Sequence, residues 1–172
     1  MNHSLENTRP IQENELIVRM AINAWEMQLK RVESLLNEIS DEQLEEDVAP
    51  GRNSGIYLLG HLVAVTDNMF PLLGMGEKKY PHLYEIFVSN PDKSGFTMPS
   101  VEVLKQNWTE VNTRLGKYFE EWPPEEWFKK HTTISEEDFA REPFRNKLNV
   151  ILNRTAHMAY HIGQLVFLKP KQ

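Results

Sequence analysis

The chain has 172 residues, 40% of them hydrophobic, and it carries 19 basic and 25 acidic residues for a formal net charge of -6. This length is enough for one domain with its own core, and the acidic balance disfavours binding to nucleic acid or to an anionic membrane surface. The sequence contains no cysteine, so any thiol chemistry would need a thiol from outside the protein.

Residues 1–12 are polar and contain Pro10, which is typical of a flexible lead-in to a single domain over residues 13–172. This start lacks the charged and apolar regions of a signal peptide. We find no later run that approaches the length of a membrane span. We therefore expect a cytoplasmic protein without a membrane partner.

Apolar residues recur at three- and four-residue intervals over residues 13–39, which predicts a first long helix. Residues 40–51 are acidic and rich in turn formers, so we expect a loop there. A second helix should begin at a cap on Asn53 or Ser54 and end at Pro71 and the glycines that follow it. This helix is apolar on most of its circumference, which predicts that it is among the most buried elements.

Residues 77–99 contain several prolines and glycines and should form a connection with one or two helical turns. Ser100 is the expected cap of a third helix that runs to about Glu121. Residues 129–134 could be extended, and a fourth helix is expected from about 144–147 to Lys169. The pattern predicts an all-α fold, a four-helix bundle with a long connection between its second and third helices.

The last predicted helix carries His157 and His161 in the run HMAYHIGQL. Residues four apart share one face of a helix, so both imidazoles can point at one spot, as two ligands of a divalent metal do. A pair alone is no site, because two such histidines can also be ordinary side chains. A third ligand must come from elsewhere in the chain.

His61 lies in the middle of the predicted second helix, within the run GHLVAVTDNM. It is either a core histidine with a hydrogen-bond acceptor or the missing third ligand, since bundle cores house metal sites built from different helices. Asn68 follows seven residues later, about two turns along the same face, and is a candidate helper.

These two runs resemble the DinB-like superfamily, most specifically in the His-Leu around His61 and the His-x3-His-x-Gly-Gln that begins at His157. The resemblance covers most of the chain. It implies a helical bundle in which His61, His157 and His161 bind one divalent metal ion, most often zinc or nickel. It also allows a homodimer, because family members often pair, although the sequence identifies no interface.

Three neutral histidines leave a coordination position open, where a bound water can lose a proton near neutral pH or an exogenous thiolate can bind. Several family members are similar to transferases that use bacillithiol or mycothiol. The resemblance therefore implies a metal-dependent enzyme acting on a small molecule, either a thiol-dependent S-transferase or a hydrolase. The alternatives are a non-enzymatic bundle with a structural or adventitious metal, and a metal-free bundle that acts through protein contacts.

Three further residues lie near the histidine pair. Arg154 is seven residues before His161 and could hold a substrate carboxylate or phosphate, or be a solvated arginine. Gln164 could orient an imidazole or form an interhelical hydrogen bond. Gly163 is expected to allow another helix to approach closely.

Overall fold

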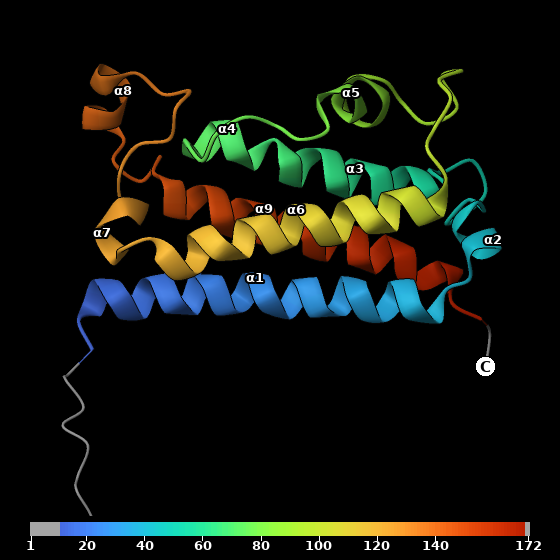
Figure 1. Ribbon diagram of the computed structural model, residues 1–172, viewed down its shortest axis with the longest axis horizontal. Helices are drawn as coiled ribbons and strands as arrows, with labels where there is room; N and C mark the ends of the chain where they lie inside the picture. The colour runs from blue at the N-terminus through green and yellow to red at the C-terminus, as the bar shows by residue number, and fades with distance from the viewer. Residues whose placement is uncertain (1–10, 171–172) are drawn as a thin grey trace, which may run out of the picture.

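The computed structural model describes residues 11–170, and this part of the chain is all-α. Four long helices run side by side (Figure 1): α1 (Glu13–Glu38), α3 (Gly55–Asp67), α6 (Val101–Glu121) and α9 (Lys147–Leu165). Between residues 11 and 170 the β-type pairs are two isolated bridges, one of which joins Lys130 to Asn146. Most of the predicted lead-in, residues 1–10, lies outside the described residues.

The predicted starts of α3, α6 and α9 are confirmed, and a side chain caps each of them. Ser54 accepts a hydrogen bond from the Tyr57 amide at the start of α3, and Ser100 accepts one from Val103 at the start of α6. Asn146 caps α9 in the same way. Each cap satisfies a backbone donor that the first turn of a helix leaves without a partner.

The expected loop at residues 40–51 contains a one-turn helix, α2 (Asp41–Leu44). A reciprocal capping box creates it: the Ser40 side chain accepts from the Gln43 amide, and the Gln43 side chain accepts from the Ser40 amide. The prediction of a plain loop is therefore wrong here, because the capping pair is enough to form a single turn.

Of the residues expected to end the second helical stretch, Gly74 does so and Pro71 does not. Pro71 lies in the first turn of α4 (Met69–Leu73), where a missing amide hydrogen costs no helical hydrogen bond. The stretch ends instead at Gly74, which adopts a φ of 78° that favours glycine.

The connection between α4 and α6 holds α5 (Pro81–Tyr84) and a π-helix, η1 (Glu85–Ser89). Both pack against α3. Between α6 and α9 lie α7 (Pro124–Trp127) and α8 (Glu136–Arg141), and the chain continues after α9 into η2 (Val166–Leu168). Residues 129–134 form a turn, with the single bridge at Lys130 as their extended part.

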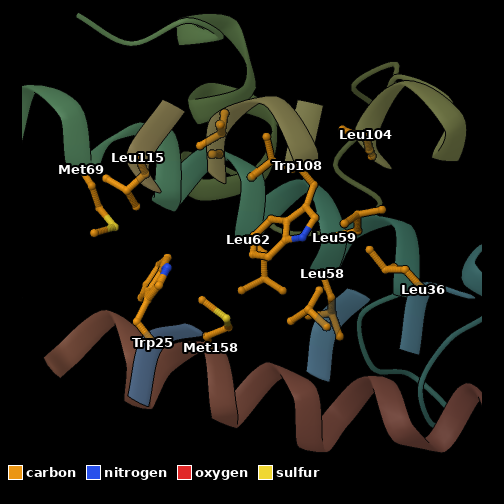
Figure 2. Packing of buried hydrophobic residues seen from close by; sticks show 14 of the residues in the cluster. Trp25, Leu36, Leu58, Leu59, Leu62, Met69, Leu104, Trp108, Leu115 and Met158 are labelled. Carbon is orange, nitrogen blue, oxygen red and sulfur yellow. The ribbon is translucent and has the colours of Figure 1, made fainter. Parts of the chain in front are cut away.

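One cluster of buried hydrophobic side chains joins the four long helices. In Figure 2, Trp25 of α1 and Met158 of α9 lie on one side of this core, across from Leu62 of α3 and Trp108 of α6. Each of these four side chains is at most 2% exposed. Burial of one such side chain stabilises the fold by about 1.5–3 kcal/mol, so the core fixes how α3 and α9 face each other.

The stretch Gly55–Leu73 is long and apolar enough to cross a membrane, contrary to the expectation that the chain has no run of this length. However, 78% of its apolar window is buried within the structure. A helix that is apolar all round is the expected core element of a helical domain, and the burial predicted for this helix is confirmed.

Candidate metal centre

Three histidine side chains from α3 and α9 meet at one place between these helices. His61 lies in the middle of α3, and His157 and His161 lie one turn apart on α9. The ring nitrogens of all three lie within 4.8 Å of one another. The three residues singled out from the sequence are therefore brought together and could hold a metal ion.

The Nε2 atoms point at each other. Nε2 of His157 lies 3.2 Å from Nε2 of His61 and 3.0 Å from Nε2 of His161. Zinc–imidazole bonds of about 2.0–2.1 Å place neighbouring ligand nitrogens about 2.9–3.4 Å apart, for coordination angles of about 90–110°. The spacing of the three imidazoles thus fits a shared divalent metal ion.

The outer nitrogens of two imidazoles have defined acceptors. Nδ1 of His61 lies 2.7 Å from the carbonyl oxygen of Phe87, and Nδ1 of His161 lies 2.7 Å from Oε1 of Gln164. An oxygen acceptor at Nδ1 requires the proton there, which leaves the Nε2 lone pair directed inward. The predicted orienting contact of Gln164 is present, and it is made within α9.

The π-helix η1 supplies the acceptor for His61, which the sequence analysis did not identify. Phe87 is fully buried and its ring lies against Gly60, where an added Cβ would come within 2.4 Å of the ring. The only sequence signal was the glycine immediately before His61. Single-turn π segments occur frequently at functional sites, and this one orients a ring of the candidate centre.

The environment favours neutral imidazoles. Burial, with the charges of His161, His61 and Arg154, lowers the pKa of His157 to about 4. Burial is also the main cause that lowers the pKa of His61 and of His161. Because metal ligands must be unprotonated, the side chains are in the form that binds a cation.

Arg154 is half-buried one turn before His157, and its charge lowers the pKa of both His61 and His157. Burial lowers the pKa of Arg154 itself, while Tyr84 of α5 raises it. Tyr84 was not a candidate in the sequence, because only the fold brings α5 toward α9.

Two other expectations differ from the structure. Asn68 ends α3 and makes no hydrogen bond to the three imidazoles, since two turns place it about 10 Å along the helix axis from His61. A Cβ on Gly163 would meet nothing within 4 Å, so the predicted close approach of another helix is wrong.

Fold and site together define a class: an all-α protein with a three-histidine group, able to hold a metal ion, between two of its long helices. A family model described as the DinB superfamily matches residues 24–165. The chain belongs to the DinB superfamily. No curated protein matches the chain.

Proposed function

We propose that the protein binds one divalent metal ion, zinc or nickel, through His61, His157 and His161 on a four-helix-bundle scaffold. We propose further that it is an enzyme acting on a small molecule, a thiol-dependent S-transferase or a hydrolase. The observation that carries this proposal is the convergence of three Nε2 atoms, at 3.0 and 3.2 Å, from two helices.

The residues around the centre have separate tasks in this proposal. Phe87 and Gln164 hold the imidazoles of His61 and His161 in one orientation and one tautomer. In this proposal a small molecule reaches the centre past His61 and His157, whose side chains are only partly buried. A divalent metal held by three neutral imidazoles supplies Lewis acidity and lowers the pKa of a water or thiol that it binds.

Metal binding is tested by elemental analysis of the untagged protein. The parent protein should contain close to one metal ion per chain, and a His61→Ala, His157→Ala double variant should contain none. His131→Ala is the matched control, since His131 bonds to Thr133 and lies outside the cluster. A parent protein that also fails to take up added zinc or nickel would contradict the proposal.

The enzyme part is tested separately with the metal-loaded protein. Transfer of a low-molecular-weight thiol to an electrophile and hydrolysis of small esters or amides are measured with the parent and with His157→Ala. Activity that is lost when the metal is removed supports the proposal that the protein is an enzyme. A loaded protein that binds no thiol and turns over no substrate favours the alternative, a structural or adventitious metal in a bundle that acts through protein contacts.

A homodimer and a cytoplasmic location also belong to the proposal. An apolar groove of about 280 Å³ lies between α1 and α9, and Met20 and Leu152 beside it are exposed. A second copy could cover these side chains. Sedimentation of the parent and of Met20→Glu tests the dimer, and cell fractionation tests the location.

A further inference from the structure

Arg154 is a cation beside the histidine cluster, and no anionic group of residues 11–170 pairs with it. The side chain is half-buried on α9, and the structure shows neither a hydrogen bond nor an ion pair for its guanidinium. None of its nitrogen atoms is completely enclosed, so its donors face accessible space. Arg19, Arg141 and Arg145, in contrast, each contact a carboxylate.

The surroundings of Arg154 make this position unfavourable for a purely structural arginine. Burial removes part of the water around the guanidinium, and the positive charge of Arg154 lowers the pKa of His61 and of His157. The hydrogen-bond partners of the three imidazoles are the Phe87 carbonyl, the Gln164 amide oxygen and each other, and none of them is a carboxylate. A divalent metal at the centre would add two positive charges to this region without a neutralising side chain.

Tyr84 lies near Arg154. It belongs to α5, in the connection that packs against α3, and it raises the pKa of Arg154. Lys78 lies over its ring, with Nζ 4.1 Å from the ring centroid. The connection therefore brings a phenol near Arg154 and an ammonium group over that phenol.

We propose that Arg154, assisted by Tyr84, binds the oxyanion group of a small-molecule substrate, a carboxylate or a phosphate, whose donor atom reaches the three-histidine centre. A guanidinium presents parallel N–H donors that match two oxygens of such a group. The substrate is thus an anion, and its charge offsets the excess positive charge of the loaded site. This inference rests on the proposed function and names the substrate class for it.

The test uses the full-length protein loaded with zinc and three thiol probes, titrated by calorimetry. The probes are 3-mercaptopropionate, 2-mercaptoethylphosphonate and the uncharged 3-mercaptopropanamide. The parent should bind one or both anionic thiols about 10- to 100-fold more tightly than the amide, as expected for a charge-assisted bidentate contact. The anionic thiol that binds more tightly identifies carboxylate or phosphate as the recognised group.

Arg154→Gln should abolish this preference while binding the amide as the parent does. Tyr84→Phe should reduce it, and Arg19→Gln, a change at an exposed arginine on α1, should leave it intact. Zinc affinity is a second readout: Arg154→Gln should bind zinc at least as tightly as the parent, because a repelling charge is removed.

The outcomes separate the two proposals. A parent that takes up no zinc overturns the proposed function and this inference with it. Zinc uptake with equal affinity for all three thiols overturns the inference alone. Weaker zinc binding by Arg154→Gln would assign the arginine a structural role and would also overturn the inference.

Discussion

The Nδ1–H group of His61 donates a hydrogen bond to the carbonyl oxygen of Phe87 at 2.7 Å. The ring of the same Phe87 lies against Gly60, the residue before His61. One residue of the π-helix therefore orients the imidazole through its main chain and packs on the supporting helix through its side chain. Both contacts require that position 60 has no Cβ.

Gly60→Ala should damage the fold and the centre together. The added Cβ would lie 2.4 Å from the Phe87 ring, so the π-helix must move away from α3. We expect the free energy of unfolding to fall by about 1–3 kcal/mol, the usual cost of overpacking. Loss of the orienting hydrogen bond should weaken metal binding about 10- to 100-fold. Urea unfolding and competition with a chromophoric chelator measure the two effects.

Gly163→Ala is the matched control. It also adds one methyl group to a helix that carries ligands, but nothing lies within 4 Å of the new Cβ. Alanine is favoured over glycine inside a helix by about 1 kcal/mol, so this variant should be more stable and should keep its metal affinity. Equal losses in both alanine variants would show that the Phe87 contact is not the cause.

Gln164→Ala removes the acceptor of the His161 Nδ1–H group. We expect metal affinity to fall about 10- to 100-fold with little change in stability, because the Gln164 side chain is partly exposed. Gln164→Glu keeps an oxygen acceptor and should retain most of the affinity. If the alanine and glutamate variants bind metal equally well, Gln164 does not orient His161.

The metal-free protein should lose stability as the pH falls from about 6.5 to about 4. An unfolded histidine has a pKa of about 6.5, and burial, with the neighbouring charges, lowers the pKa of His157 in the fold to about 4. At His157 the unfolded chain therefore binds more protons than the folded chain in this window, so the contribution of His157 to stability rises with pH there and is constant above it.

The same experiment on His157→Gln isolates this contribution. Urea unfolding of both proteins is followed between pH 4.5 and 7.5 in the presence of a chelator. The free energy of unfolding of the variant should depend less steeply on pH, because the variant lacks a group that takes up a proton in the unfolded chain. Identical slopes would mean that His157 titrates normally in the folded protein.

Ser54→Ala should cost more stability than Ser100→Ala. Both serines cap a long helix, but Ser54 is buried and its amide and hydroxyl also donate to Asp92. Loss of a cap costs about 0.5–2 kcal/mol, and we expect Ser54→Ala at the upper end and Ser100→Ala at the lower. Thermal unfolding should show a difference in Tm of about 2–4 °C for each kcal/mol. Equal Tm values would show that the hydrogen bonds to Asp92 do not add to the stability of the fold.

The long helices could be predicted because their signals are local. Apolar periodicity defines the extent of α1, and periodicity together with a capping side chain defines the starts of α6 and α9, within a few residues. The one-turn helix α2 and the π-helix η1 are too short to show a period. Their formation depends on a capping box in one case and on packing against α3 in the other.

The three candidate ligands were found from their spacing and from the family resemblance, whereas their surroundings were not. Phe87 contributes a main-chain carbonyl, which no residue type reveals in a sequence. Tyr84 comes near Arg154 only through the path of the connection. Such partners depend on tertiary structure. A shared helix face does not ensure contact either, since Asn68 makes no hydrogen bond to the three imidazoles.

The pairing of the first and last long helices has a consequence for biosynthesis. α1 packs most extensively against α9, and α9 carries two of the three histidines. α9 is synthesised after α1 and α3. Until α9 has left the ribosome the nascent chain lacks the helix that covers α1 and the partners of His61, so core closure and assembly of the cluster must both follow the synthesis of α9.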